Sequence, residues 1–212
     1  NCIVLFGGEP LLCIDKIRKI IQYNKEHCNN YYYFSMNTNG LLLNNNEIYK
    51  IISDYASSYR FKLEVSYDKS GQCRRMFNGS NSDELIKSVL FKLNKDKVPF
   101  YVGYTVHKGN YKNVINDVIY IFEKYNNING IEVRFAITDI ENLVNTNNFI
   151  HDTYRKLKYI YMKYGKSICT DCEDICKLCG KCNHYSKTDT YISDNLKRSK
   201  KSNDNDNLFS DF

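Results

Sequence analysis

The sequence lacks any run of about 18 uninterrupted apolar residues, the length that a membrane-spanning helix requires. Its most apolar segments, residues 11–21 and 115–122, are interrupted by Asp, Lys, Arg or Asn. It also lacks an initiator Met and the basic, apolar and small-residue order of a signal peptide, which suggests that the numbering begins inside a longer reading frame. We therefore expect a soluble protein that has no membrane partner.

Proline is scarce and the excess of positive charge is small. The chain has 2 Pro and 10 Gly among 212 residues, with 42% hydrophobic and 25% charged residues, which is typical of one globular domain or one domain with an appendage. The net charge is +6, and its one basic run, residues 197–201, lies in a segment that also carries several Asp. Nucleic acid is therefore a poorly supported partner. Residues 186–212, rich in Lys, Asn, Asp and Ser, are expected to form a disordered tail.

Nine cysteines without a secretory signal argue against a disulfide scaffold. Four are scattered along the chain, and the other five follow the spacing C-x2-C-x3-C-x2-C-x2-C. Loops of two residues allow neighbouring thiolates to reach one metal centre. We predict that residues 168–185 form a metal-binding segment with these ligands: Cys169, Cys172, Cys176, Cys179 and Cys182.

Two metal centres fit this segment. The C-x2-C-x2-C spacing of the last three cysteines is that of ferredoxin-type cluster loops, and either earlier cysteine could supply the fourth ligand of an iron–sulfur cluster. Zinc is the alternative, with His184 as a substitute ligand. Five free surface thiols are the least favoured interpretation.

Short apolar strands alternate with amphipathic helices along residues 1–140, and a last helix is expected within residues 141–167. The predicted strands cover residues 2–6, 31–36, 61–66, 100–106 and 131–137. The predicted helices cover residues 11–27, 47–58, 83–94, 111–125 and 149–164, with Ser82 as an N-cap. Single helices between strands imply parallel pairing. Five such units indicate an α/β fold with an open or partial barrel, or a doubly wound sheet that lacks one element.

Ligands of parallel α/β sheets bind at the carboxyl ends of the strands, so the residues that follow each strand are the candidate site. These positions are residues 7–10, 37–40, 66–68, 107 and 138–139. His107 could line a pocket there, but a satisfied structural histidine is the favoured interpretation.

Gly7, Gly8, Glu9 and Pro10 stand where the first strand passes into a helix. Paired glycines allow a ligand to approach the backbone, and proline suits the first position of a helix. A carboxylate beside free carbonyls suits an ammonium group better than a phosphate, which would need bare amides and Lys. The alternative is an ordinary tight turn with a solvated Glu.

The residues from Phe6 to Leu12 resemble the GGEP motif of the radical S-adenosylmethionine (SAM) superfamily. Residues 36–40 are similar to the family's TNG motif, with Thr38 and Asn39. Residues 65–68 resemble its S-x-D-G strand end, with Ser66 and Asp68 but with Lys69 where the family often has Gly. The resemblance covers residues 3–138 and implies a partial (βα)6-type radical SAM barrel with a small Cys-rich C-terminal segment.

The resemblance also implies roles. Glu9 and the backbone of Gly7 and Gly8 would bind the methionyl amine of SAM. Ser66 or Asp68 would contact the ribose or carboxylate, and Arg75 the carboxylate. A [4Fe-4S] cluster would pass one electron to SAM and break a carbon–sulfur bond, which gives a 5'-deoxyadenosyl radical that abstracts a substrate hydrogen. Because such clusters need a reducing compartment, we expect a cytoplasmic protein. The implied partners are SAM, a one-electron reductant such as flavodoxin or ferredoxin, and a substrate for which a peptide is one candidate.

The family's first strand leads into a C-x3-C-x2-C cluster loop, and no such triplet occurs near residue 1. We expect the first βα unit and the ligands of this cluster to lie upstream of the sequence. Cys2 and Cys13 do not replace them, because their positions on a strand and on a first helical turn are typical of core residues. The rival hypothesis is a non-catalytic metal-binding module on a degenerate barrel.

Overall fold

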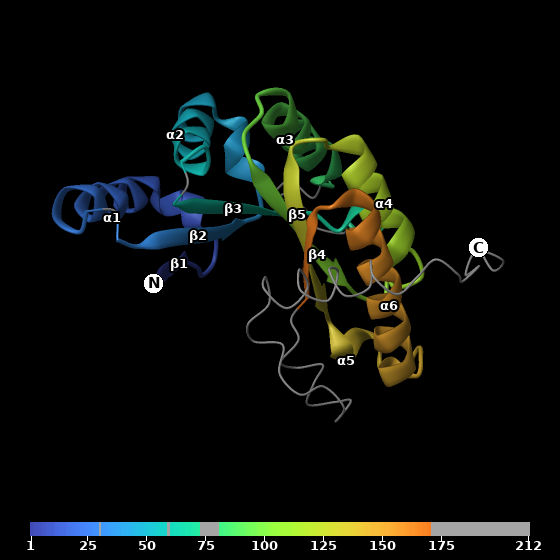
Figure 1. The fold of residues 1–212 in the computed structure, drawn as a ribbon. Helices are drawn as coiled ribbons and strands as arrows, with labels where there is room; N and C mark the ends of the chain where they lie inside the picture. Colours follow the sequence, from blue (N-terminus) through green and yellow to red (C-terminus); the bar gives the residue numbers. More distant parts are fainter. Residues whose placement is uncertain (30, 59, 73–80, 171–212) are drawn as a thin grey trace. The chain divides into compact units, whose positions relative to one another are not determined.

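The computed structural model describes residues 1–29, 31–58, 60–72 and 81–170 (Figure 1). Residues Asn1–Asp171 form one compact unit. Within it, six parallel strands make one sheet in the order in which they occur along the chain. The strands are β1 (Cys2–Leu5), β2 (Tyr33–Thr38), β3 (Phe61–Ser66), β4 (Phe100–Val106), β5 (Ile128–Phe135) and β6 (Ser167–Thr170).

A helical connection follows each of the first five strands, as parallel pairing requires. The α-helices are α1 (Ile14–His27), α2 (Asn46–Ala56), α3 (Asp83–Lys95), α4 (Val114–Lys124), α5 (Ile137–Ile140) and α6 (Thr146–Tyr164). Three short 3-10 helices stand at strand ends: η1 (Pro10–Cys13), η2 (Leu41–Asn44) and η3 (Lys69–Gly71). In Figure 1, α1, α2, α3, α4 and α6 follow one another around one side of the sheet.

The two faces of the sheet differ in chemistry because side chains alternate along a strand. On β3, Leu63 and Val65 are buried in the apolar core, together with Val102 of β4 and Val133 of β5. The residues between them are mostly polar. They point to the opposite face, which we call the open face because the long helices pack on the apolar one. The open face carries Lys62, Glu64, Ser66, Thr105, Glu132 and Arg134.

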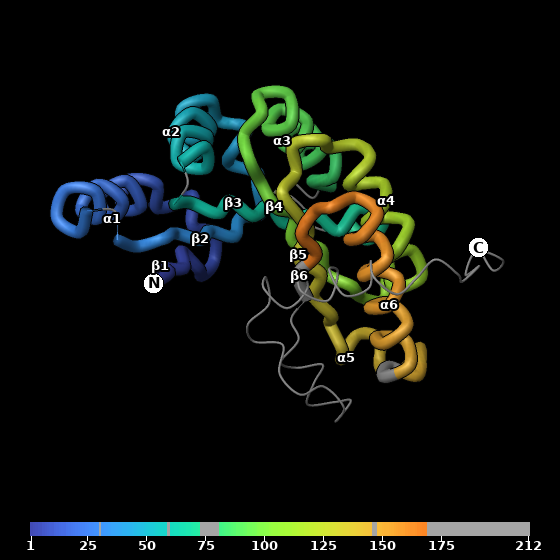
Figure 2. The backbone as a smooth tube through the Cα atoms, viewed as in Figure 1, coloured from blue at the N-terminus to red at the C-terminus, as the bar shows by residue number. Residues whose placement is uncertain are grey.

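The α/β class and the alternating order of elements are confirmed, and the predicted bounds of β3 and β4 agree with the structure. One strand was not predicted: β6 follows α6 and pairs with β5 along its whole length (Figure 2). Strand β6 spans the boundary between the predicted segments 141–167 and 168–185. It is short and includes Ser, Cys and Thr, so no apolar run marks it in the sequence. Pairing with β5 makes this segment a strand.

The start of α3 differs from the prediction in its hydrogen bonds. Ser82 occupies the N-cap position, but its side chain makes no capping hydrogen bond. Its hydroxyl instead accepts from Nε2 of Gln72 at 3.1 Å. The side-chain oxygen of Asn81 accepts from the N–H of Asp83 at 2.9 Å. The prediction of Ser82 as the N-cap residue is confirmed for its position, whereas its side chain makes no capping hydrogen bond and binds the buried amide of Gln72.

Candidate functional site

The turn that follows β1 depends on two glycines. Gly7 has φ +106° and Gly8 has φ +50°, and both residues are exposed. A Cβ atom on either would meet no atom within 4 Å, so backbone conformation rather than packing requires glycine here. Pro10 then begins η1, as its fixed φ favours. The main chain of this turn is open to a ligand.

Glu9 follows the two glycines, and its carboxylate joins two turns of the chain. Oε1 accepts hydrogen bonds from the backbone N–H of Leu11 at 3.1 Å and from the hydroxyl of Thr38 at 2.6 Å. Oε2 accepts from the backbone N–H of Asn39 at 2.9 Å. An ionised carboxylate offers about four acceptor positions. These three contacts therefore leave room on Oε2 for one further donor.

The turn after β2 contains Thr38 and Asn39, which donate hydrogen bonds to Glu9. Thr38 is 1% exposed, and its Oγ1 also accepts from the N–H of Gly40 at 3.0 Å. The side-chain oxygen of Asn39 accepts from the N–H of Leu41 at 2.9 Å, which starts η2. Gly40 has φ +78°, and a Cβ there would lie 2.8 Å from Cγ1 of Val65. Both conformation and close packing therefore require glycine at residue 40.

The carboxyl end of β3 carries two of the predicted site residues in different surroundings. The hydroxyl of Ser66 donates to Oδ1 of Asn37 at 2.9 Å on the open face. Asp68 is 4% exposed, and its Oδ1 accepts from the backbone N–H of Thr105 at 2.8 Å. Asp68 thus joins the ends of β3 and β4 from a buried position. Arg75, the third residue predicted for this stretch, lies outside the described residues.

A buried aspartate of α4 fixes the loop that follows Asp68. Asp117 is 3% exposed and accepts from the N–H and the hydroxyl of Ser70 and from the hydroxyl of Tyr104. Its other oxygen lies 3.8 Å from Nζ of Lys69. Lys69 has φ +47°, so the backbone adopts at this position the left-handed conformation for which glycine is suited.

His107, at the end of β4, has both ring nitrogens occupied within the chain. Nδ1 accepts from the N–H of Gly109 at 3.1 Å, and Nε2 lies 3.1 Å from the carbonyl oxygen of Gly71, to which it can donate in the neutral tautomer that these partners assign. The interpretation of His107 as a satisfied structural histidine is confirmed.

Four charged residues of the open face were missed by the sequence analysis. Nζ of Lys62 lies 3.7 Å from Oε2 of Glu64 and 3.3 Å from Oε2 of Glu132. The guanidinium of Arg134 lies 2.7 Å from Oε1 of Glu64 and 2.7 Å from Oε2 of Glu132. Each cation thus contacts both carboxylates. We call these four residues the charge ring.

The charge ring spans three strands, and a glycine makes room for it. Lys62 and Glu64 belong to β3, and Glu132 and Arg134 belong to β5. Between them on β4 is Gly103, where a Cβ would lie 2.5 Å from Oε1 of Glu64 and 2.9 Å from a guanidinium nitrogen of Arg134. A side chain at residue 103 would therefore displace the ring.

Burial and mutual contact give the two carboxylates of the ring different pKa values. Burial raises the pKa of Glu64 to about 7, and the neighbouring Glu132 adds to the rise while Arg134 opposes it. Burial also disfavours the ionised form of Glu132, but contacts with Glu64, Lys62 and Arg134 outweigh it and lower the pKa of Glu132. At neutral pH, a proton in the ring therefore belongs to Glu64.

The scattered cysteines do not lie where the sequence analysis expected. Cys2 and Cys13 are both exposed, so the prediction that they are core residues was wrong. The side chain of Cys2 belongs to the edge strand β1, on the face opposite to the helices, and Cys13 ends η1 where the chain turns into α1.

Most of the predicted metal segment, residues 168–185, lies outside the described residues. Cys169 lies in β6, where its backbone is in register with Glu132. The other four predicted ligands lie outside the described residues: Cys172, Cys176, Cys179 and Cys182. Within the described part of the chain, no three His, Cys, Asp or Glu residues are grouped so that they could hold a metal ion.

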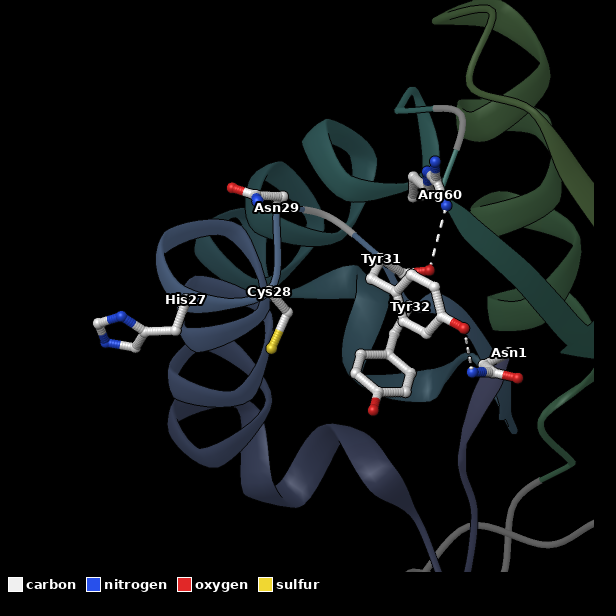
Figure 3. A pocket seen from close by; sticks show the side chains of 7 residues that line it. All are labelled: Asn1, His27, Cys28, Asn29, Tyr31, Tyr32 and Arg60. Carbon is white, nitrogen blue, oxygen red and sulfur yellow. Dashed lines mark hydrogen bonds between the residues drawn. The ribbon is translucent and has the colours of Figure 1, made fainter.

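A hollow of about 770 Å³ lies at the opposite edge of the sheet (Figure 3). It is formed where the chain approaches the amino ends of β1, β2 and β3. Its lining includes Cys28, Tyr31 and Arg60, whose NH1 donates to the carbonyl oxygen of Tyr31 at 3.3 Å. Ligands of parallel sheets bind at the carboxyl edge, so we do not place the functional site in this hollow.

No protein-family model and no curated protein matches the chain. Its fold is similar to a solved structure of histidine-tagged anSMEcpe with bound AdoMet, a radical SAM enzyme of the anaerobic sulfatase-maturating type. The TM-score is 0.61 at 18% sequence identity, over 86% of this chain and 51% of that one. The chain thus spans about half the length of this neighbour. The likeness shows that the six-stranded parallel sheet and its helices match the partial barrel of this radical SAM neighbour. No described helix combines the length and the apolar character that crossing a membrane needs.

Proposed function

We propose that the carboxyl edge of β1, β2 and β3 binds SAM and that the chain is the core of a radical SAM enzyme. The observation that carries this proposal is the carboxylate of Glu9. It joins the Gly7-Gly8 turn to the turn of Thr38 and Asn39, so two motifs of the resemblance form one constellation at the edge where ligands of such sheets bind.

The residues of this edge fit the polar end of SAM. The exposed main chain of Gly7 and Gly8 offers carbonyl oxygens, and the remaining acceptor position on Glu9 Oε2 supplies charge-assisted bonding for an ammonium group. Thr38 and Asn39 hold Glu9 in place. Ser66 lies on the open face within reach of a ligand over β2 and β3, whereas Asp68 acts from its buried position by fixing the strand end.

When bound beside a reduced iron–sulfur cluster, SAM supplies the 5'-deoxyadenosyl radical that abstracts a hydrogen atom from the substrate. The described residues offer no ligand set for that cluster, so we assign it no residue of this chain. Arg75 as a carboxylate ligand and the five C-terminal cysteines as ligands of an auxiliary cluster or zinc stay part of the proposal. So do a peptide substrate and a flavodoxin or ferredoxin as electron donor.

The test is a titration of the isotope-labelled 212-residue chain with SAM, followed by the backbone amide NMR signals. We expect the signals of Gly7, Gly8 and Asn39 to move, and we expect Glu9→Gln to weaken binding about tenfold or more because a charged acceptor is lost. Glu26→Gln, at an exposed position of α1, is the matched control. Unchanged signals at millimolar SAM, or equal affinity of the Glu9 variant and the wild type, would overturn the proposal.

A further inference from the structure

The charge ring presents its cations more than its carboxylates. The side chains of Lys62 and Arg134 are 23% and 29% exposed, whereas those of Glu64 and Glu132 are 3% and 16% exposed. The two acids thus lie deeper, and the two bases lie nearer the solvent. Among the four members of the ring, the guanidinium and the ammonium group are therefore the more accessible to a ligand.

The position of the ring on the sheet relates it to the candidate site. Ser66, at the end of β3, is in register with Gly103, and Gly103 is in register with Glu132. Arg134 is two residues further along β5 and therefore stands near its carboxyl end. The ring thus lies on the same face as Ser66. Arg134 extends it toward the same edge, whereas Lys62 stands near the amino end of β3.

We propose that Arg134 and Lys62 bind a carboxylate group of the substrate, with Glu64 and Glu132 holding the two cations in position. This inference rests on the proposed function and adds the class of substrate, one that carries a carboxylate. The planar guanidinium is suited to pair with a carboxylate.

The carboxylate of SAM itself does not account for the ring. The ammonium and carboxylate groups of one amino acid are bonded to a single Cα, so the nitrogen and the carboxylate carbon lie only about 2.5 Å apart. The carboxylate of Glu9 lies at the end of β2, against Thr38 and Asn39, whereas the ring is centred over Gly103 of β4. Two strand spacings of about 4.8 Å separate β2 and β4 along the sheet. A ligand whose ammonium group binds at Glu9 therefore needs another group to reach the ring.

The experiment compares two probes that differ in one group: N-acetylglycylglycine, with a free carboxylate, and its C-terminal amide. The 212-residue chain is titrated with each, and the side-chain Nε–H NMR signal of Arg134 is followed. We expect the acid to move this signal and the amide to leave it in place. We expect Arg134→Gln to weaken binding of the acid about tenfold, as loss of a charged hydrogen bond does.

Two further variants keep the test decisive. Arg155→Gln, on α6 with an 82% exposed side chain, is the matched control and should bind the acid as the wild type does. Lys62→Gln should also weaken binding of the acid, and it replaces Arg134→Gln if that variant does not fold. Equal responses to acid and amide, or wild-type affinity in a folded variant of either cation, would overturn the inference.

The same titrations separate this inference from the proposed function. If SAM moves the signal of Arg134 as strongly as those of Gly7 and Gly8, the ring belongs to SAM and the substrate assignment is wrong. If SAM moves none of them while the acid still binds at Arg134, the proposed function fails and the carboxylate site remains.

Discussion

The hydroxyl of Thr38 donates to Oε1 of Glu9 at 2.6 Å, so the last residue of β2 is bound to the turn that follows β1. Thr38 is almost fully buried, and the same Oγ1 accepts from the amide of Gly40. One threonine therefore orders its own turn and orients the neighbouring carboxylate. Two motifs distant in sequence become a single structural unit through this contact.

Replacement of Thr38 by Val tests this unit. Valine keeps the shape but removes the donor to Glu9, so the buried contact is lost. We expect the free energy of unfolding, measured by urea denaturation, to fall by about 1–3 kcal/mol. Thr38→Ser, which keeps the hydroxyl, should lose less. Equal stability of the Val and Ser variants would mean that the bond to Glu9 contributes nothing.

Gly103→Ala should disrupt the charge ring. The added Cβ would lie 2.5 Å from Oε1 of Glu64, and overpacking of this kind costs about 1–3 kcal/mol. In the background of Glu64→Ala, where the crowded carboxylate is absent, the same substitution should cost less, and a double-mutant cycle measures the difference. Additive effects of the two substitutions would contradict the close contact.

The sequence was sufficient for the features that depend on local chemistry. The apolar runs of β3 and β4 predicted their bounds, and the glycines at residues 7, 8 and 40 marked turns that have positive φ in the structure. The charge ring had a partial signal, because Lys62 and Glu64 alternate with apolar residues on β3. Glu132 and Arg134 do the same on β5.

The remainder depended on pairing between distant strands. The ring forms because register brings β3 and β5 to either side of Gly103, and periodicity within one strand does not contain this register. Strand β6 forms because the backbone of β5 supplies its hydrogen-bond partners. Cys2 is exposed because β1 is an edge strand and the residue faces away from the helices. Asp68 is of a residue type that is common in binding sites. Its burial and the hydrogen bond that it accepts from the N–H of Thr105 could not be inferred, because they depend on the pairing of β3 with β4.

Glu64 should make stability depend on pH. Its pKa rises from the usual 4.5 to about 7 on folding, so between these values the folded state holds a proton that the unfolded chain releases. The free energy of unfolding should therefore decrease as pH rises through this window, by up to about 3 kcal/mol. Glu64→Gln should remove the decrease in urea-denaturation profiles.

Glu132→Gln is the contrasting variant for the same profiles. The pKa of Glu132 is lowered on folding, so its contribution is present above the usual carboxyl value and is lost as pH falls below it. The Glu132→Gln variant should therefore lose less of its free energy of unfolding than the wild type as pH falls below this value. If the wild type and Glu64→Gln decrease equally between pH 4.5 and 7, the assignment of the buried proton to Glu64 is wrong.

Lys69 allows backbone strain to be separated from side-chain contacts. Its φ is +47°, and its ammonium group lies 3.8 Å from Asp117 and 4.4 Å from the centre of the Tyr120 ring. Lys69→Ala and Lys69→Gly both remove these contacts, but glycine alone relieves the left-handed conformation. We expect the Gly variant to be more stable than the Ala variant by about 1 kcal/mol in thermal or urea unfolding. Greater stability of the Ala variant would contradict the assigned conformation.

The predicted metal segment can be tested apart from the SAM site. The 212-residue chain, reconstituted anaerobically with iron and sulfide or, in a separate sample, with zinc, should take up about one metal centre, because binding of the metal supplies the free energy that orders a short ligand loop. Truncation after Asp171, the end of the compact unit, should abolish uptake, and the exposed pair Cys2→Ala and Cys13→Ala should leave it unchanged. A brown product indicates iron–sulfur and a colourless one with bound zinc indicates zinc. If all nine thiols stay titratable after both treatments, the segment holds no metal, because coordinated thiolates resist modification.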